Sequence, residues 1–257
     1  MRGLEGRLAL VTGATGFIGT AITNRLISEG VTVVATSRQI DKVRKHYQNR
    51  QDCERIIPLE IDLSCKESIS KELDRISEQF GTPSILIANA SLREGLEKSF
   101  SSLEHSDFSR IFEVDLAGHF FCARQLVEHL PNHETASFVF LSSIYSLAGV
   151  DSSIYPKEMS PTPVQYAVTK SAELGLVRHL ASLWGKFGIR VNGVVAGGVR
   201  SNQRQSEEFV KKYSGKTMLG RMATAEEIAS SVAFLASDEA SYITGECLAV
   251  DGGFLAW

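Results

Sequence analysis

Residues 7–29 have the sequence RLALVTGATGFIGTAITNRLISE. The segment Arg7–Thr12 is a short apolar run that predicts a buried strand, and Thr20–Glu29 carries apolar residues at helical spacing. Three glycines lie between these segments: Gly13, Gly16 and Gly19. Glycines let a backbone approach an anion closely, and the start of a helix offers unpaired N–H groups. The stretch therefore predicts a strand, a turn and a helix that together hold a pyrophosphate group.

Strand and helix patterns alternate along the rest of the chain. Short apolar or β-branched runs predict strands at Val31–Thr36, Ile56–Ile61, Ser84–Ala88, Ser137–Ser142, Ile189–Val195 and Cys247–Val250. Helical patterns lie between them, at about Asp41–Asn49, Lys66–Phe80, Leu103–Leu130, Pro163–Phe187 and Ala225–Ala236. Short strands that are apolar throughout are typical of a parallel sheet buried on both faces. We expect an α/β fold of the Rossmann type, a doubly wound parallel sheet of about seven strands with helices on both faces, in one domain over residues 1–257.

The composition is that of an ordinary globular protein, with 43% hydrophobic and 22% charged residues. A net charge of −3 without a basic stripe gives no indication of nucleic-acid binding. No apolar stretch approaches the roughly 20 residues needed to span a bilayer. The first residues show no basic region followed by a long apolar run, so we expect no signal peptide. These features predict a cytoplasmic protein with no nucleic-acid or membrane partner.

The four cysteines are not arranged for metal or disulfide chemistry. They are Cys53, Cys65, Cys122 and Cys247. None are paired as C-x-x-C, and no group of histidines accompanies them. We expect no metal site and interpret the cysteines as small apolar residues.

Tyr166 and Lys170 are four residues apart, a spacing that places both on one face of a helix. A phenol has an ordinary pKa near ~10 and is a poor acid or base at neutral pH. An ammonium one helical turn away favours the phenolate. The pair is therefore a candidate for proton transfer to or from a substrate oxygen.

Several motifs stand in the order found in the short-chain dehydrogenase/reductase family. They are the glycine turn, Asn89-Ala90, Ser142-Ser143, Tyr166 with Lys170, Arg190-Val-Asn192, Leu219-Gly-Arg-Met222, Thr244-Gly245 and Val250-Asp-Gly-Gly253. The chain resembles this family over nearly all of its 257 residues. The tail and the neighbourhood of Asn202-Gln203 resemble a subset linked to bacterial flagellin modification and surface-sugar biosynthesis. The resemblance implies an NAD(P)-dependent oxidoreductase that interconverts a carbonyl and an alcohol.

In the family the glycine turn holds the cofactor phosphates. This implies cofactor contacts from Gly13, Thr15, Gly16, Phe17, Ile18 and Gly19. The commonest form of the family has three residues between the first two glycines and one between the last two, whereas two and two intervene here. Phe17 stands where the family usually has glycine. The motif predicts dinucleotide binding and leaves the local geometry open.

Ser37 and Arg38 stand at the end of the second predicted strand, where no acidic residue is present. An acid at this place would bond the 2′-hydroxyl of NAD, whereas a nearby Arg can pair with the 2′-phosphate of NADP. A guanidinium binds phosphate through two parallel hydrogen bonds. We predict NADP as the cofactor, with NAD as the alternative.

The resemblance implies three more groups of cofactor contacts. They are Asp62 and Leu63 at the adenine ring, Asn89 and Ala90 at the adenosine ribose, and Gly197, Val199 and Ser201 at the nicotinamide amide, in addition to Tyr166 and Lys170. Ala196 stands where the family has proline. We expect this change to loosen the turn without removing its backbone donors.

The family's reaction uses a Tyr that exchanges a proton with the substrate oxygen, a Lys that supports it and bonds the nicotinamide ribose, and a Ser that bonds the same substrate oxygen. Tyr166 and Lys170 match the first two. The family's Ser usually lies about 13 residues before the Tyr, which is the position of Ser153. We assign Ser143 instead, because it ends a predicted strand at the edge where sites of this fold form. An insertion of about ten residues within Val150–Pro163 then explains the spacing, and Ser153 is the alternative.

A fourth family residue, an Asn in the preceding long helix, holds a water in a proton relay. The segment Val114-Asp115-Leu-Ala-Gly118 matches this motif with Asp115 in place of Asn. The backbone carbonyl makes much of the water contact in the family, so Asp115 can still act as the fourth catalytic residue. Alternatively, a buried carboxylate near Lys170 pairs with it, and catalysis is retuned or impaired.

The leading hypothesis is an NADP(H)-dependent oxidoreductase of a small-molecule carbonyl or alcohol, with a sugar derivative favoured by the subset resemblance. A 3-oxoacyl-type reductase is the alternative, because the tail motif also occurs there. A cofactor-binding family member without reductase activity is a further alternative, motivated by Asp115, Phe17 and Ala196.

Two further expectations follow from the family. Residues Asn202–Tyr213 correspond to its substrate lid, and their polar content argues against a greasy substrate. Family members are usually dimers or tetramers, so we expect a homodimer or homotetramer. The helices Leu103–Leu130 and Pro163–Phe187 would pack across a two-fold axis, with the apolar end Gly253–Trp257 buried in a neighbour.

Overall fold

The computed structural model describes residues 1–131, 134–201 and 205–257. Its centre is a seven-stranded parallel sheet with the strand order β3-β2-β1-β4-β5-β6-β7. The strands are β1 (Leu8–Val11), β2 (Thr32–Ser37), β3 (Ile56–Glu60), β4 (Ile85–Ala88), β5 (Ala136–Ser143), β6 (Ile189–Ala196) and β7 (Cys247–Val250). Each corresponds to a predicted strand, and the predicted doubly wound sheet is confirmed.

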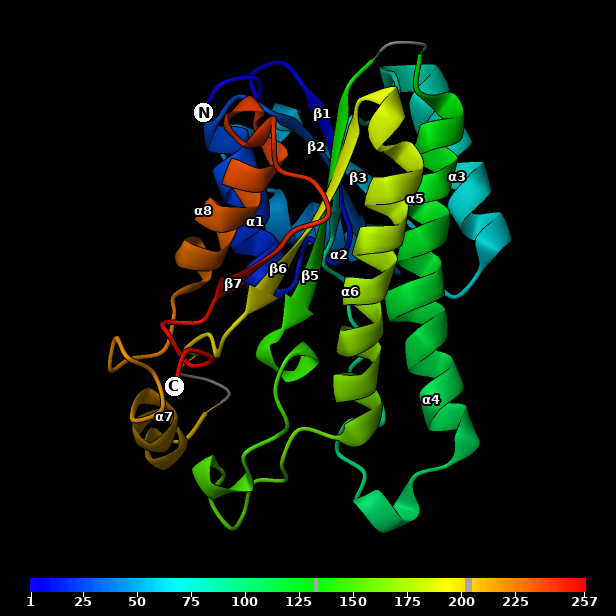
Figure 1. Cartoon of the computed structure of the whole chain (residues 1–257). Coiled ribbons are helices and arrows are strands. Elements are labelled where there is room, and N and C mark those ends of the chain that lie inside the picture. Colours follow the sequence, from blue (N-terminus) through cyan, green and yellow to red (C-terminus); the bar gives the residue numbers. More distant parts are fainter. Residues whose placement is uncertain (132–133, 202–204) are drawn as a thin grey trace.

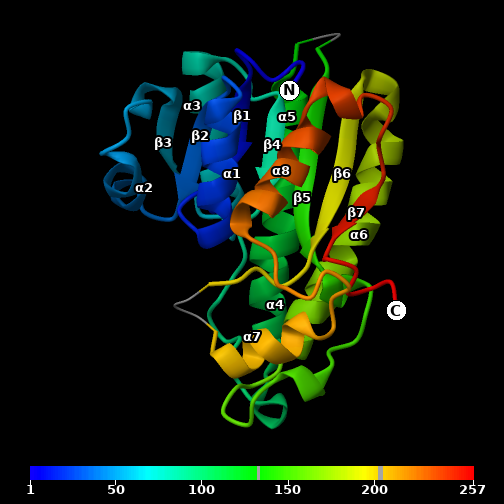
Figure 2. The same cartoon turned by 90° about the vertical axis from the view of Figure 1, so that its left-hand side faces the viewer.

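Helices cover both faces of this sheet, with α1 and α8 on one face and α3, α5 and α6 on the other (Figure 1, Figure 2). The helices are α1 (Phe17–Ser28), α2 (Ile40–Tyr47), α3 (Lys66–Phe80), α4 (His105–Ile111), α5 (His119–His129), α6 (Val164–Trp184), α7 (Glu207–Ser214) and α8 (Ala225–Ala236). Short 3₁₀ turns occur at Cys53–Arg55, Phe100–Ser102, Ile144–Ser146, Ser152–Ile154, Gly185–Phe187 and Asp238–Ala240. In the described residues no helix has both the length and the apolar character needed to cross a membrane.

Most of the core lies in two layers, one on each side of the sheet, and a third, smaller cluster includes Ile144, Leu174 and Phe209. In β1, Ala9 and Val11 belong to the layer that contains the apolar faces of α1 and α8, whereas Leu10 belongs to the layer under α3, α5 and α6. Successive side chains of a strand point to opposite faces, so a strand buried on both faces must be apolar at every position. This explains why the strands appear in the sequence as continuous apolar runs.

The strand order places a crevice between β1 and β4. The chain builds outward from β1 through β2 to β3, then returns to β4 on the other side of β1. Ligands of open α/β sheets bind at the carboxyl ends of the strands where the order reverses. The motifs that follow β1, β4, β5 and β6 are therefore brought to one edge, near α7 and the C-terminus (Figure 1).

Two predicted helices differ from those observed. The first begins at Phe17 rather than Thr20, so Gly19 lies within the first turn of α1. The predicted helix Leu103–Leu130 begins at His105 and contains a π-helical segment, η3 (Phe112–Gly118), between α4 and α5. Local periodicity did not predict this segment, because its partners come from distant parts of the chain.

Candidate active site

A cleft of about 890 Å³ runs along the carboxyl ends of the strands. The cleft brings together Ser143 and every residue predicted to contact the cofactor: Gly13, Thr15, Gly16, Phe17, Ile18, Gly19, Ser37, Arg38, Asp62, Leu63, Asn89, Ala90, Tyr166, Lys170, Gly197, Val199 and Ser201. Asp115 is fully buried and lies outside this lining. Residues 202–204 of the predicted lid lie outside the described residues, and α7 forms the part of the lid from Glu207 onward.

The turn after β1 is packed too tightly for larger residues at two glycines. A β-carbon at Gly19 would lie 2.2 Å from the Gly13 carbonyl oxygen and 2.8 Å from Asn89 Nδ2. A β-carbon at Gly13, whose φ is +64°, would lie 2.9 Å from Ala90 Cα. Gly16 precedes the first residue of α1, so the N–H groups of the helix start face the cleft. This cradle fits a phosphate group, and Phe17 is 41% exposed beside it rather than filling it.

Thr12 ties the ends of β1 and β4 together. Its Oγ1 accepts the backbone N–H groups of Asn89 and Ala90 at 2.9 and 3.0 Å. In return, the Asn89 side-chain amide donates hydrogen bonds to the carbonyls of Thr12 and Gly13 at 2.9 and 3.2 Å. The crevice at the point where the strand order reverses is thus held by neutral hydrogen bonds.

His119 connects this network to the π-helical segment. Its Nδ1 lies 2.8 Å from the Asp115 carbonyl oxygen, and its Nε2 lies 2.9 Å from Thr12 Oγ1. A carbonyl can only accept, so Nδ1 carries the proton and Nε2 accepts from the Thr12 hydroxyl. Full burial lowers the pKa of His119 to about 4. The ring is therefore a neutral bridge between the glycine turn and Asp115.

The rim beyond β2 carries two exposed cations. Arg38 and Lys42 both line the cleft beside Ser37, the last residue of β2. Hydrogen bonds from the hydroxyl and backbone N–H of Ser64 hold the pKa of Asp62 below its usual value, and the charge of Arg38 adds to this effect. Arg38 and Asp62 therefore share one rim of the cleft.

The segment after β6, which follows the alanine at position 196, is held by hydrogen bonds to its own chain. The Gly197 N–H donates to the Val250 carbonyl at 3.0 Å, which fixes the turn against β7. Further along, the Ser201 N–H donates to the Gln205 side chain, which in turn donates to the Val199 carbonyl, both at 2.9 Å. The backbone that was predicted to face the nicotinamide amide is therefore held by its own chain.

Ser143 and Tyr166 come to the cleft from different elements, the end of β5 and the first turn of α6. Ser143 Oγ accepts the Tyr145 N–H at 3.3 Å, which leaves the hydroxyl proton for another acceptor. Within the described part of the chain, the Tyr166 hydroxyl has no hydrogen-bond partner. Ser153 is exposed and lies outside the residues that line the cleft. Of the two serines considered, Ser143 is the one that shares the cleft with Tyr166.

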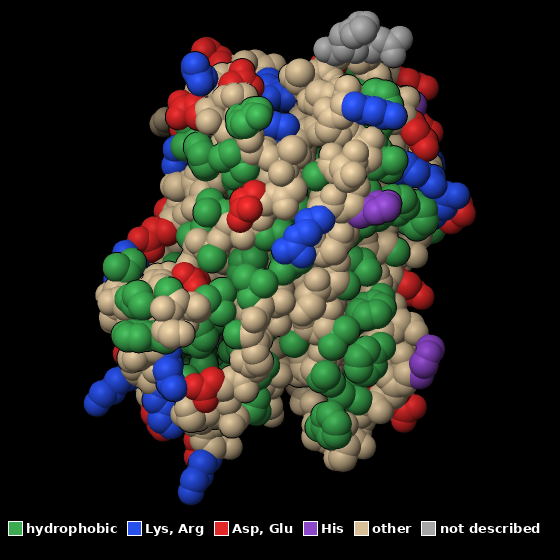
Figure 3. All heavy atoms as spheres, viewed as in Figure 1, with side chains coloured by type: hydrophobic (Ala, Val, Ile, Leu, Met, Phe, Trp, Pro, Cys, Tyr) green, Lys and Arg blue, Asp and Glu red, His purple; other side chains and the backbone are tan. Residues whose placement is uncertain are grey.

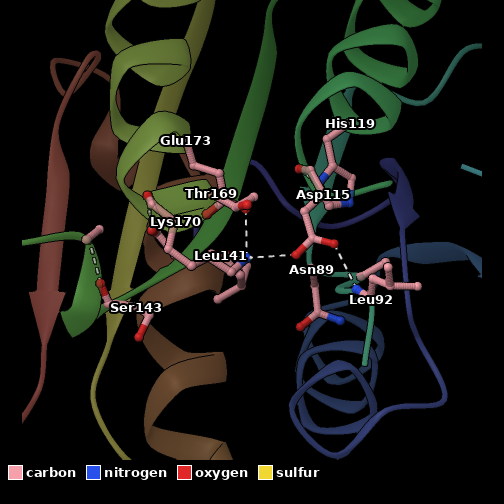
Figure 4. A network of polar contacts seen from close by, with 12 residues as sticks. Asn89, Leu92, Asp115, His119, Leu141, Ser143, Thr169, Lys170 and Glu173 are labelled. Carbon is pink, nitrogen blue, oxygen red and sulfur yellow. Dashed lines mark hydrogen bonds and ion pairs between the residues drawn. The ribbon is translucent and has the colours of Figure 1, made fainter. Parts of the chain in front are cut away.

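Lys170 is buried behind Tyr166, with its Nζ 5.7 Å from the centre of the Tyr166 ring. The ammonium donates to Glu173 Oε1 at 2.7 Å and to the Leu141 carbonyl at 3.0 Å (Figure 4). Burial disfavours its charge, but the carboxylates of Glu173 and Asp115 outweigh that cost and raise the pKa of Lys170. Lys170 is therefore a permanently charged group beside the phenol.

Asp115 belongs to the π-helical segment and faces Lys170 from across the gap between that segment and α6 (Figure 4). Its Oδ1 accepts the Leu92 N–H at 2.8 Å, and its Oδ2 lies 3.6 Å from Lys170 Nζ. Oδ2 has no hydrogen-bond partner among the described residues. The structure thus contains the Asp115–Lys170 ion pair that the sequence left as an alternative, while the Asp115 carbonyl accepts from His119.

The far end of the cleft is aromatic and hydroxylated. The hydroxyls of Tyr145 and Tyr155 are 2.6 Å apart, and the Tyr155 hydroxyl is 2.8 Å from Thr162 Oγ1. Phe209 and Tyr213 pack beside them, with ring centres 5.9 Å apart. Tyr155 and Thr162 belong to the predicted insertion, which therefore lines the cleft beyond Ser143 and Tyr166.

Four polar side chains of this site were missed in the sequence: Thr12, Lys42, His119 and Glu173. Two of them carry a detectable signal, since His119 is four residues after Asp115 and Glu173 is three residues after Lys170. Such spacings place side chains on one helical face. Thr12 and Lys42 had no comparable signal, because their partners depend on how strands and loops meet.

Comparisons with known proteins agree with this geometry. A family model described as "Enoyl-(Acyl carrier protein) reductase" matches residues 13–255. The chain is 30% identical over 260 residues to cis-4-hydroxycyclohexanecarboxylate dehydrogenase of Sinomonas cyclohexanicum, covering 97% of each protein. It is also 30% identical over 255 residues to 3-oxoacyl-(acyl-carrier-protein) reductase of Aquifex aeolicus, covering 97% of this chain and 98% of that protein.

Among solved structures, a short-chain dehydrogenase from Leptospira borgpetersenii with bound NAD+ superposes with a TM-score of 0.85 at 27% identity, covering 97% of this chain and 93% of that one. The chain therefore belongs to the short-chain dehydrogenase/reductase family. It is an oxidoreductase that acts on alcohol or carbonyl groups with NAD(P).

Proposed function

We propose that this protein is an NADP(H)-dependent oxidoreductase that interconverts a carbonyl and an alcohol on a hydroxylated small molecule, such as a sugar derivative. The observation that carries this proposal is the meeting of Ser143, Tyr166 and Lys170 in one cleft with the glycine cradle. A nicotinamide cofactor bound in that cleft supplies the hydride-transfer chemistry.

Three side chains of the protein carry out the proton transfer and stabilise the developing charge. Tyr166 exchanges the proton with the substrate oxygen, since its hydroxyl is free of partners in the described residues and faces the cleft. Ser143 donates its available proton to the same oxygen and stabilises the charge that develops there. Lys170 favours the phenolate form of Tyr166 through its permanent charge.

The preference for NADP rests on Arg38 and Lys42. A 2′-phosphate brings negative charge to the end of β2, where these two exposed cations line the cleft. The acidic residue of the neighbouring strand end, Glu60, accepts the Ile40 N–H at 3.0 Å and so has a structural partner already. NAD, which lacks this phosphate, gains less from such a rim.

The preference for a hydroxylated substrate rests on the hydroxyl row formed by Tyr145, Tyr155 and Thr162. A site built to bond hydroxyls discriminates strongly against apolar analogues, because its polar groups would be left unpaired. A 3-oxoacyl substrate is the second candidate, favoured by the apolar lining from Met159, Phe209 and Met222 and by the similarity to the Aquifex reductase.

Replacing Tyr166 with Phe tests the proposed chemistry. We expect turnover on a panel of carbonyl substrates to fall by at least about 10²-fold, because the proton donor is removed while the ring remains. Binding of NADPH, measured by fluorescence titration, should persist. Tyr242→Phe is the matched control, since Tyr242 is fully exposed. Unchanged turnover in Tyr166→Phe would exclude the proposed role.

Replacing Tyr155 with Phe tests the proposed substrate class. The variant breaks the hydroxyl row without changing the ring, so kcat/KM for polyhydroxylated carbonyls should fall by roughly tenfold or more. Activity on a 3-oxoacyl thioester should change little. A loss confined to the thioester would favour the second candidate.

We also propose that the protein associates with copies of itself through the helices α4 and α5, with the segment η3 between them, and α6. Hydrophobic side chains gather over these helices on the face shown in Figure 3, and Val168 and Leu183 of α6 are 43% and 49% exposed. Trp257 at the C-terminus is 78% exposed. Sedimentation should show a dimer or tetramer, and a monomer at micromolar concentration would contradict this.

A further inference from the structure

Glu173 is a buried acid that the proposed reaction does not use. It lies one helical turn beyond Lys170 on α6 and is 1% exposed. Its Oε1 accepts from Lys170 Nζ at 2.7 Å, and its Oε2 has no hydrogen-bond partner among the described residues. Figure 4 shows the Lys170 ammonium in contact with both Glu173, from its own helix, and Asp115.

The cluster holds more negative than positive charge when both acids are ionised. Lys170 has three N–H donors, of which two bond Glu173 and the Leu141 carbonyl, and Asp115 Oδ2 lies 3.6 Å away. All three side chains are at least 96% buried. An uncompensated charge in such a place is costly, so one carboxyl group is expected to hold a proton.

Glu173 is the better candidate for that proton. Asp115 accepts a backbone N–H from Leu92 in addition to facing Lys170, whereas Glu173 accepts from Lys170 alone, because the nearby Ser142 hydroxyl donates to the Lys170 carbonyl at 2.9 Å. Burial raises the pKa of Glu173 to about 7, although Lys170 opposes the shift. Its charge is therefore expected to change within the range of pH in which enzymes work.

We propose that Glu173 is a positioning residue that holds Lys170 beside Tyr166 and, by gaining or losing its proton, sets the charge that acts on Tyr166. When Glu173 is neutral, the cluster is balanced and the ammonium favours the phenolate. When Glu173 is ionised, the extra carboxylate opposes the phenolate. This inference deepens the proposed function, because it concerns the role assigned to Tyr166.

The other charged and ionisable groups near Glu173 come from several elements. From its own helix, Lys170 stays protonated, and from η3 and α5 come the Asp115 carboxylate and the neutral His119. The Cys247 thiol of β7 lies close to Glu173, Arg178 and Glu246, and Tyr145 belongs to the turn after β5. Burial raises the pKa of both Cys247 and Tyr145, so these two stay neutral.

Spectroscopic titration of Tyr166 tests the proposal without any substrate. The tyrosinate absorbance of Tyr166 is the difference between the protein and its Tyr166→Phe variant as pH rises. We expect this signal to appear about one pH unit lower in Glu173→Gln than in the parent, because Gln keeps the hydrogen bond and removes the charge. Glu173→Asp should restore the parent curve, and the exposed-surface control Glu226→Gln should not move it. A curve that stays in place or moves upward in Glu173→Gln would overturn the proposal.

Infrared spectroscopy of the unmodified protein provides a second test if Glu173→Gln does not fold. A buried protonated carboxyl group has a C=O stretching band that is lost on ionisation. We expect such a band at about pH 5.5 and its loss by about pH 8.5. Absence of the band at the lower pH would show that Glu173 is always ionised and would refute the proposal. Failure of the proposed function is distinct, since it would appear as unchanged turnover in Tyr166→Phe.

Discussion

The two walls of the cleft hold their functional groups by different physical means. At the ends of β1 and β4, Thr12, Asn89 and the glycine turn are joined by neutral hydrogen bonds of 2.9–3.2 Å. Between β5 and α6, Lys170 lies between two buried carboxyl groups, each with one oxygen that lacks a hydrogen-bond partner among the described residues.

This difference shows where sensitivity to charge is located in the molecule. A neutral network with all its bonds made keeps its shape over a wide range of pH, whereas a buried charged cluster depends on every member. Changes to the first wall should therefore act through steric fit. Changes to the second should act through charge and should depend on pH.

Removing the buried cation is expected to have the largest effect. Lys170→Met leaves two carboxyl groups in the core without their counter-ion, and we expect the free energy of unfolding to fall by about 3–5 kcal/mol at neutral pH. Urea denaturation measures this change. Lys186→Met, at an exposed site, is the control and should change stability by less than about 0.5 kcal/mol.

Measuring the stability of Lys170→Met at two pH values tests whether charge holds this wall together. At about pH 5 the carboxyl group of Glu173 is protonated more readily, so the decrease in the free energy of unfolding caused by Lys170→Met should be smaller than at neutral pH. A loss that is equal at both pH values would mean that packing, rather than charge, holds this wall together.

A steric change in the glycine turn should have the next largest effect. Gly19→Ala places a β-carbon 2.2 Å from a carbonyl oxygen of the backbone, which cannot move aside easily. We expect a destabilisation of about 1–3 kcal/mol and at least a tenfold loss of NADPH affinity, measured by urea denaturation and fluorescence titration. The effect should be the same at pH 5 and pH 8, unlike that of Lys170→Met.

Gly175→Ala is the matched control for this prediction. Gly175 lies in α6, and a β-carbon there would meet no atom of the same protomer within 4 Å apart from the backbone of its own helix. Alanine favours helix over glycine by roughly 0.5–1 kcal/mol, so this variant should be more stable than the parent. Opposite signs in the two variants would show that the cost at Gly19 is steric.

The charged wall should also give the protein a pH-dependent stability. The folded-state pKa of Glu173 is raised to about 7, so its contribution is fully present below its unfolded pKa near 4.5 and is lost as pH rises through about 7. Between about pH 5 and 8, the free energy of unfolding of the parent should fall by an amount on the order of 1–2 kcal/mol that is absent in Glu173→Gln. Urea denaturation of both proteins measures this difference. Parallel curves for the two proteins would contradict the prediction.

His119 gives the free energy of unfolding the opposite dependence on pH. Its folded-state pKa is lowered from 6.5 to about 4, so its contribution is present above 6.5 and is lost as pH falls through about 4. The two pH windows, about 4.5 to 7 for Glu173 and about 4 to 6.5 for His119, overlap with opposite signs, so only the difference between the parent and Glu173→Gln separates the two contributions.

The comparison also explains what the sequence could reveal. The sheet was predictable because each strand is a continuous apolar run, a direct consequence of burial on both faces. The glycine turn was predictable because a close backbone approach excludes other residues. Both are properties of consecutive residues, and the cofactor-binding candidates drawn from them all line one cleft.

The charged wall was less predictable because its contacts join distant residues. The π-helical segment is bound through Asp115 to Leu92 and through His119 to Thr12, at separations of 23 and 107 residues. Gly118 is required there because a β-carbon would lie 2.4 Å from the Leu63 carbonyl oxygen. Such constraints leave no local periodicity, so an ordinary helix was predicted in its place. Glu173 had the right spacing from Lys170, but only the structure shows that it is buried.

The smallest expected effect concerns the preference for NADP over NAD, which depends on the rim of the cleft rather than on either wall. Arg38 is exposed and lines the cleft at the end of β2, so Arg38→Ser should leave the fold intact. We expect NADPH affinity to fall by about tenfold, equivalent to roughly 1.4 kcal/mol, because one charged contact to the 2′-phosphate is lost. NADH affinity should change by less than about twofold, since NADH has no such phosphate. Parallel fluorescence titrations with the two cofactors measure both, with Arg44→Ser as the exposed control on α2. Equal losses for NADPH and NADH would mean that Arg38 shapes the rim rather than reading the phosphate.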